Sequence, residues 1–189
     1  MNAPIDVTDI RIETSRLILR AWRQEDLADL YEYASVPDVG ERAGWKHHES
    51  MEESQKILDR FIAGKKTFAL VDRETGKVIG SVGLEPRDED AGLPEALLGR
   101  EVGYVLSRDY WGRGLMPEAV KAVMDYCFSV LDYDYLTCGH FDFNDRSRRV
   151  CEKCGFRFLK SVNTVIYNGE SVPGKLYICY NPDREVTNV

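Results

Sequence analysis

A glycine-containing turn between an apolar run and an amphipathic segment is the feature that most constrains this chain. Residues 102–106 are largely apolar, residues 109–116 read Asp-Tyr-Trp-Gly-Arg-Gly-Leu-Met, and a helical pattern follows from Pro117 to Leu131. Gly112 and Gly114 can adopt positive φ angles and let the backbone come close to a ligand. Because the first N–H groups of a helix lack intrahelical partners, this strand–turn–helix unit predicts a phosphate site.

The turn matches neither of two common nucleotide-binding motifs. No Gly-Lys-Ser/Thr follows it, as a P-loop requires, and Pro117 stands where the dinucleotide fingerprint has its third glycine. We expect Pro117 at the first helical position, where its missing N–H has no cost. The candidate phosphate donors are therefore the main-chain amides of residues 113–116.

Residues 144–156 form a second strand-bordered helical unit. Asn144 is a favourable N-cap, Val150 and Cys154 lie one turn apart on one face, and Gly155 is a typical stop signal before a strand beginning at Phe156. This unit places a short helix about thirty residues after the glycine turn.

Together the two units resemble the GNAT acetyltransferase superfamily. Its acetyl-CoA motif reads Gln/Arg-x-x-Gly-x-Gly/Ala, and its later helix reads Asn-x-x-Ser/Ala followed by Glu-Lys-x-Gly-Phe. Tyr-Trp-Gly-Arg-Gly-Leu-Met and the opening Glu-Thr-Ser-Arg-Leu-Ile-Leu-Arg at residues 13–20 are most similar to the ribosomal-protein N-terminal (alanine/serine) acetyltransferases. The resemblance covers roughly residues 12–181 and implies one N-acetyltransferase domain over residues 1–189.

Two positions depart from the family pattern. Asp109 occupies the first motif position, where a carboxylate beside a pyrophosphate is unfavourable, so we expect it to point away while Arg108 or Arg113 supplies positive charge. Cys151 replaces the tyrosine that many relatives carry before Glu-Lys, which moves attention to Ser147 as the acid.

The resemblance implies acetyl-CoA as co-substrate, with no metal. The pyrophosphate is expected at the glycine turn, and the pantetheine between the strands at 101–106 and 135–140, which splay apart in the family. The residues expected to bind acetyl-CoA are Tyr104, Val105, Leu106, Trp111, Gly112, Arg113, Gly114, Leu115, Met116, Asn144 and Ser147.

Glu101 and Ser147 are the candidate catalytic residues. The family often has a glutamate that takes the amine proton through water at the position of Glu101; the alternative is a solvated acid paired with Arg100. Ser147 either faces the thiol or caps its helix. Trp45, His47 and His48 lie in the loop that shapes the acceptor pocket in this family, although histidines in a polar loop can also be simply solvated.

The pattern of apolar residues predicts an α+β fold. We expect a mixed, mostly antiparallel sheet of about six to seven strands with helices on both faces, as in GNAT proteins. The predicted strands are 16–21, 67–71, 78–84, 100–106, 135–140, 156–167 and 175–180, and the predicted helices are 24–34, 50–62, 117–131 and 147–154. Residues 86–93 are predicted to form a polar loop.

Composition limits the remaining choices. A formal charge of −7 argues against nucleic acid as a ligand, and no apolar run approaches the ~20 residues of a membrane span. Five cysteines and no signal-peptide pattern favour the cytoplasm. Cys151 and Cys154 could form a redox or zinc pair, but two small buried side chains one turn apart are the simpler interpretation.

The sequence therefore predicts a cytoplasmic, acetyl-CoA-dependent N-acetyltransferase that is a monomer or homodimer. The acceptor is expected to be a primary amine, possibly a protein or peptide N-terminus, that attacks the thioester directly. Two alternatives stay open: a small-molecule N-acetyltransferase acting on an antibiotic, polyamine or amino acid, and a catalytically inactive CoA-binding regulatory domain.

Overall fold

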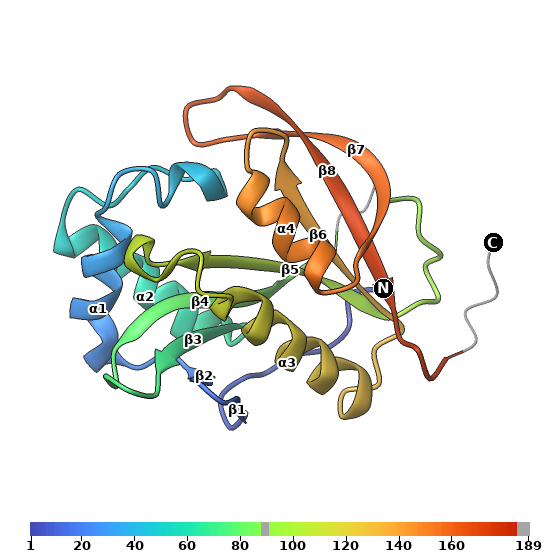
Figure 1. The fold of residues 1–189 in the computed structure, drawn as a ribbon, viewed down its shortest axis with the longest axis horizontal. Coiled ribbons are helices and arrows are strands. Elements are labelled where there is room, and N and C mark those ends of the chain that lie inside the picture. Colours follow the sequence, from blue (N-terminus) through green and yellow to red (C-terminus); the bar gives the residue numbers. More distant parts are fainter. Residues whose placement is uncertain (88–90, 185–189) are drawn as a thin grey trace.

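The computed structural model describes residues 1–87 and 91–184, and its centre is one sheet of eight strands (Figure 1). The strand order is β1-β2-β3-β4-β5-β6-β8-β7. Within the described residues, neighbouring strands pair antiparallel except β5 and β6, which run parallel. The mostly antiparallel α+β fold is as expected, with more strands than the six to seven predicted. Part of the predicted 86–93 loop, residues 88–90, lies outside the described residues.

The elements follow one another with short connections. The strands are β1 (Arg11–Glu13), β2 (Leu17–Ala21), β3 (Thr67–Asp72), β4 (Val78–Glu85), β5 (Gly99–Leu106), β6 (Tyr135–Phe141), β7 (Arg157–Val165) and β8 (Ser171–Tyr180). The α-helices are α1 (Leu27–Ala34), α2 (Met51–Gly64), α3 (Leu115–Ser129) and α4 (Asp145–Lys153). Short 3-10 turns occupy Gln24–Asp26, Glu41–Ala43 and Arg108–Tyr110.

Helices cover both faces of the sheet because its central strands are apolar on both sides. In β3, Phe68 and Leu70 join the core beneath α3 and α4, whereas Ala69 and Val71 join a second core beneath α1 and α2. This division follows from the strand period of two, which sends successive side chains to opposite faces.

The sheet opens between β5 and β6. These strands pair from Gly99↔Tyr135 to Val102↔Cys138, after which the register ends although both strands continue. The helices α3 and α4 lie on the same side of this opening (Figure 1). The splay expected between these two strands is therefore present, and it places the ends of both strands beside the starts of α3 and α4.

The sequence prediction of several boundaries was wrong. Strand β1 was missed, because three residues paired with β2 are too short to carry a periodic pattern. Helix α3 begins at Leu115, so Pro117 is its third residue rather than its first. The consequence is small, since a third-position N–H also lacks an intrahelical acceptor. Among the described residues, no helix is long and apolar enough to cross a membrane.

Candidate active site

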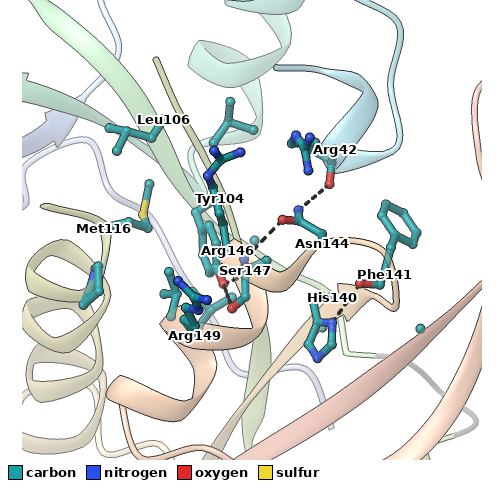
Figure 2. Close-up of a pocket in the computed structure, with 18 of the residues that line it drawn as sticks. Arg42, Tyr104, Leu106, Met116, His140, Phe141, Asn144, Arg146, Ser147 and Arg149 are labelled. Atoms are coloured by element: carbon teal, nitrogen blue, oxygen red, sulfur yellow. Dashed lines mark hydrogen bonds between the residues drawn. The ribbon is translucent and has the colours of Figure 1, made fainter. Parts of the chain in front are cut away.

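A cavity of about 840 Å³ lies at the opening between β5 and β6. Its wall is built from the ends of both strands, the glycine turn, the first turn of α3, one face of α4 and part of β7. Eleven of the residues expected at the site line it: Glu101, Tyr104, Val105, Leu106, Trp111, Gly112, Gly114, Leu115, Met116, Asn144 and Ser147. Residues from two separate sequence units thus meet around one space (Figure 2).

The glycine turn has the backbone that the sequence predicts. Gly112 and Gly114 have φ angles of 78° and 76°, and Gly114 is the N-cap residue of α3. A Cβ at Gly112 would meet no protein atom within 4 Å, and one at Gly114 would approach only Arg16 Nη2, at 3.7 Å. The turn is therefore open toward the cavity, where a phosphate group could contact the first amides of α3.

Glu118 connects the glycine turn to residues 14–16 by hydrogen bonds. Its carboxylate accepts hydrogen bonds from Thr14 Oγ1 at 2.6 Å, from the Arg16 main-chain N–H at 3.0 Å and from Arg16 Nε at 2.8 Å. Arg16 Nη1 also donates to the Arg113 carbonyl at 2.9 Å. Partial burial opposes ionisation, but the hydrogen bonds from Thr14 and Arg16 prevail and lower the pKa of Glu118. These contacts give residues 14–16 a role in holding the glycine turn.

Positive charge reaches the cavity from α4 rather than from Arg108 or Arg113. Arg146, Arg149 and Lys153, spaced at i, i+3 and i+7, all line the cavity. Arg113 instead lies over the Tyr110 ring at 4.9 Å, outside the cavity wall, and Asp109 is exposed. The Arg113 side chain therefore does not supply charge to the cavity, while its main-chain amide stays a predicted phosphate donor. The helical spacing of the three basic residues was visible in the sequence and could have identified them.

The cavity fits an anionic, elongated ligand. Its charged lining residues in the described part of the chain are four cations and one carboxylate: Arg42, Arg146, Arg149, Lys153 and Glu101. Arg146 also stacks on Trp111, with its guanidinium carbon 4.6 Å from the ring centroid. A local excess of positive charge in a chain of net charge −7 is what binding of a multiply phosphorylated co-substrate requires.

We expect Arg149→Ala to weaken acetyl-CoA binding about three- to tenfold at low ionic strength, because a cavity cation is lost. The difference should shrink as salt is added. Arg148→Ala is the matched control, since Arg148 is ion-paired with Asp145 at 3.1 Å and Glu152 at 3.0 Å and does not line the cavity. Isothermal titration at two salt concentrations measures both. Equal affinities for the two variants would contradict this placement of the phosphates.

Glu101 lies on β5 just before the strands separate. Because side chains alternate along a strand, Glu101, Gly103 and Val105 share one face of the sheet. A Cβ at Gly139 of β6 would lie 3.4 Å from Glu101 Oε1, so this glycine leaves room for the carboxylate. The neighbouring residue on β4, Glu85, is directly opposite Glu101 and is ion-paired with Lys66. Glu101 thus brings a carboxylate to the cavity at the point where the sheet opens.

Asn144 and Ser147 lie at the start of α4. The Asn144 side chain caps the helix by accepting from the Ser147 N–H at 3.2 Å, and it donates to the Arg42 carbonyl at 3.0 Å (Figure 2). Both the oxygen and the nitrogen of the Asn144 side chain therefore have hydrogen-bond partners within the protein, which explains its role as the N-cap of α4. Ser147 lies half-buried in the cavity wall, with its hydroxyl 2.9 Å from that of Tyr104.

Trp45, His47 and His48 do not line the cavity, so their assignment to the acceptor pocket needs correction. His48 is buried, packs against Trp45 with the two rings tilted by 45°, and has Nδ1 2.7 Å from Ser54 Oγ. His47 Nδ1 lies 2.8 Å from Glu41 Oε1. Burial lowers the pKa of His48. These side chains stabilise their own loop, and the residues of that loop that reach the cavity are Val39, Arg42 and Ala43.

The sequence analysis missed the far wall of the cavity. It is formed by Gly139, His140 and Phe141 of β6 and by Val162, Asn163, Thr164 and Val165 of β7. The Nδ1 of His140 lies 2.9 Å from the Phe141 carbonyl, and Nε2 has no hydrogen-bond partner among the described residues. The expected separation of β5 and β6 could have identified the last residues of β6 as part of the cavity wall. The β7 residues reach the cavity only through pairing of β7 with β8, which no local pattern specifies.

Four of the five cysteines are buried, and Cys179 is half-buried. Cys138 and Cys151 are fully buried, with their sulfur atoms 3.3 Å apart, and Cys154 Sγ lies 3.7 Å from the Pro117 carbonyl. In the described part of the chain, no group of three or more His, Cys, Asp or Glu residues is arranged to hold a metal ion. Cys151 and Cys154 thus occupy the packed side of α4.

Comparison with known proteins connects this cavity to one family. The family model described as acetyltransferase (GNAT) domain matches residues 16–157. The uncharacterised N-acetyltransferase p20 of Bacillus licheniformis is 32% identical over 63% of this chain and 66% of its own length. The uncharacterised N-acetyltransferase YoaA of Bacillus subtilis is 25% identical over 90% of this chain and 97% of its own length.

Solved structures share the fold. An acetyltransferase (GNAT family) from Bacillus anthracis has a TM-score of 0.79 and 20% identity, covering 91% of this chain and 99% of its own. The ribosomal-protein-S5-alanine acetyltransferase of Vibrio fischeri has a TM-score of 0.69 and 21% identity, covering 93% and 98%. The microcin C7 self-immunity acetyltransferase MccE, in complex with acetyl-CoA and AMP, has a TM-score of 0.73 and 16% identity, covering 88% and 93%.

Proposed function

The chain belongs to the GNAT acetyltransferase family and is an acetyl-CoA-dependent N-acetyltransferase, and from this premise we propose that it acetylates the N-terminal amine of a peptide or protein by direct attack. The observation that carries the proposal is the placement of Glu101 and the glycine turn on one cavity at the opening of the sheet. A base and a phosphate site in the same cavity suit attack of an amine on a bound thioester.

In this proposal, each requirement of the reaction is met by a part of the cavity. The turn at Gly112 and Gly114 holds the pyrophosphate. The gap beyond Val102 takes the pantetheine, and a main-chain amide between Tyr104 and Leu106 stabilises the oxyanion. The Ser107 N–H donates to the Ile79 carbonyl oxygen of β4. Because the main-chain groups of successive residues alternate in direction along a strand, those of Tyr104 are turned away from β4, toward the gap.

Glu101 is the proposed base. It takes the proton of the attacking ammonium group through a water molecule, so that the amine carries a free electron pair. The amine then forms the N–C bond, the nitrogen of the tetrahedral intermediate loses its second proton to solvent, and the C–S bond breaks with its electron pair on sulfur. Ser147, which also lines the cavity, donates a hydrogen bond to that sulfur.

The peptide acceptor is inferred from similarity and from the far wall of the cavity. The ribosomal-protein-S5-alanine acetyltransferase shares the fold, and its name specifies a protein acceptor. The far wall includes four consecutive residues of β7, Val162 to Val165, which offers main-chain groups to an extended peptide. MccE, whose complex contains AMP, has the same fold. A small-molecule acceptor is therefore the alternative to a peptide.

An acceptor panel tests this proposal. Release of the CoA thiol is followed with short peptides beginning with Ala or Ser, the same peptides with blocked N-termini, spermidine and kanamycin. We expect release with the free peptides and none with the blocked ones. Faster release with spermidine or kanamycin than with any peptide would replace the peptide acceptor by a small-molecule amine.

We expect Ser147→Ala to slow turnover about tenfold, the value of one hydrogen bond of about 1.4 kcal/mol. The effect is moderate because the leaving thiolate has a conjugate acid of pKa near ~8.5 and needs little help. The KM for acetyl-CoA should change little. Steady-state kinetics at saturating acceptor measures both quantities, and an unchanged kcat would remove Ser147 from the chemistry.

We also propose that the protein works in the cytoplasm as a monomer or homodimer. The five cysteines are all free thiols, which suits a reducing compartment. Light scattering on the purified protein distinguishes these two states from a larger assembly.

A further inference from the structure

The side chain of Tyr104 crosses the opening of the sheet from β5 to α4. Its hydroxyl lies 2.9 Å from Ser147 Oγ and 3.2 Å from the Ser147 carbonyl oxygen, and Figure 2 shows the two side chains together at the start of α4. The sequence analysis expected Tyr104 to bind acetyl-CoA and gave its side chain no further role. The structure adds a side-chain contact with the residue proposed to assist the leaving group.

Two buried thiols complete the surroundings of this hydroxyl. Cys151 Sγ and Cys138 Sγ each lie 3.8 Å from the Tyr104 oxygen. Cys151 has a small side chain, and the Tyr104 ring reaches the space beside it. Because thiols are weak donors and weak acceptors, the contacts with Ser147 are the strong hydrogen bonds of this phenol.

The number of protons on the two hydroxyl groups limits which of them can donate to the other. Tyr104 has one proton, which either the Ser147 hydroxyl at 2.9 Å or the Ser147 carbonyl oxygen at 3.2 Å can accept, and the hydroxyl is the nearer of the two. Ser147 Oγ itself has one proton and two acceptor lone pairs. If Tyr104 donates to Ser147 Oγ, the serine proton must point elsewhere, and Ser147 lines the cavity. Burial, assisted by the neighbouring Cys138 and Cys151, raises the pKa of Tyr104 well above its ordinary value. The phenol therefore keeps its proton and remains a donor at neutral and moderately alkaline pH.

We propose that Tyr104 is a positioning residue for acetyl transfer, whose O–H donates to Ser147 Oγ and directs the serine proton into the cavity toward the thioester sulfur. This inference rests on the proposed function of Ser147. It assigns to a β5 side chain the task of orienting a hydroxyl on α4. It also gives a reason for a tyrosine at a strand position where its main chain alone would suffice to bind the co-substrate.

No proton leaves Tyr104 during the reaction. The ammonium group loses one proton to Glu101 through water, and its nitrogen loses a second proton to solvent after the N–C bond forms. When the C–S bond breaks, its electron pair stays on sulfur and the Ser147 O–H stabilises the developing thiolate by a hydrogen bond. The thiolate takes its proton from water after release, since the thiol pKa is near ~8.5. Tyr104 acts throughout by donating to Ser147, so its contribution should not titrate in the working range.

A double-mutant cycle tests the proposal. We expect Tyr104→Phe to lower kcat about three- to fivefold, less than Ser147→Ala, with a KM for acetyl-CoA unchanged within about twofold. The double variant should be no slower than Ser147→Ala alone, because Tyr104 acts through Ser147. The ratio of wild-type to Tyr104→Phe kcat should stay constant between about pH 7 and about pH 9, as expected of a phenol that stays protonated.

Tyr177→Phe is the matched control. Tyr177 lies on β8, is buried and packs against His140 and Phe158, so its variant removes a phenol hydroxyl away from Ser147. We expect its kcat to equal that of the wild type. Thermal shift with acetyl-CoA confirms that each variant is folded and binds the co-substrate.

Three results would overturn the proposal. They are an unchanged kcat for Tyr104→Phe, multiplicative losses in the double variant, and a loss in Tyr104→Phe when Ser147→Ala has none. In each of these cases the wild-type enzyme still acetylates an amine, so the proposed function stands. Absence of acetyl transfer by the wild type with every acceptor would instead refute the proposed function and this inference with it.

Discussion

Replacing Glu101 by Gln should lower the turnover rate about 10²-fold at neutral pH, because the variant keeps the shape of the side chain and loses its ability to accept a proton. Acetyl-CoA binding should change little, since Glu101 lies at the opening of the strands and the glycine turn lies at the start of α3. The loss should become smaller as the pH rises, where more of the acceptor amine is already deprotonated. Stopped assays of CoA release over a range of pH measure this profile.

Glu85→Gln is the matched control for that experiment. Glu85 is directly opposite Glu101 on β4, but it is ion-paired with Lys66 and does not line the cavity. Its variant should retain activity within about twofold of the wild type, as for most surface substitutions. An unchanged rate in Glu101→Gln would assign proton removal to another group, and His140 in the cavity wall would then be the first to examine.

Gly114→Val should abolish the stabilisation of the fold by acetyl-CoA. The wild type should gain about 2.7 kcal/mol at a hundredfold excess of ligand over Kd, because acetyl-CoA binds the native state alone. In the variant, a branched side chain is placed at the first turn of α3, where the φ angle is 76° and the phosphate is expected. Thermal denaturation with and without acetyl-CoA measures the difference.

Gly76→Val is a control that separates the backbone strain caused by Gly114→Val from its obstruction of the phosphate site. Gly76 has a φ of 74° in the turn between β3 and β4, and a Cβ there would meet no protein atom within 4 Å. It therefore imposes similar backbone strain far from the cavity, and its acetyl-CoA shift should survive. NAD and ATP should stabilise the wild type far less than acetyl-CoA. Equal shifts from all three ligands would contradict the assignment of the turn.

The fold could be predicted wherever a strand or helix was long enough to show its period. The strands around Val102 and Leu136 and the helix after Gly114 were placed within a few residues. Strand β8 begins at Ser171 rather than Lys175, because its first residues pair with the end of β7 in a hairpin. Pairing across a turn of this kind depends on tertiary contacts and leaves no local signal.

The candidate site was predictable where main-chain geometry makes it. Gly112 and Gly114 were identified from their conformational freedom, and the capping role of Asn144 from its position before a helix. Side-chain directions were harder to anticipate. His48 turns inward to Ser54, and Tyr104 reaches across to Ser147, because each follows the packing of a neighbouring element.

The cation stripe on α4 is an intermediate case. Arg146, Arg149 and Lys153 have the spacing of one helical face. By residue type alone, however, Arg148 could equally be a phosphate-binding cation. The tertiary structure decides between them, because Arg146, Arg149 and Lys153 line the cavity whereas Arg148 is ion-paired with Asp145 and Glu152. Helical spacing therefore proposes a charged face, and only the packing of the helix identifies its ligand side.

The central claim is direct transfer of an acetyl group from acetyl-CoA to an amine at the opening between β5 and β6. A quenched single-turnover reaction with radiolabelled acetyl-CoA and a peptide beginning with Ala tests it most directly. We predict that the label moves to the peptide amine, that CoA release requires the peptide, and that no label stays on the protein. The thiol of Cys151, which a covalent mechanism would acetylate, is fully buried. Label trapped on Cys151 in the absence of peptide, or no label on any amine, would contradict the account.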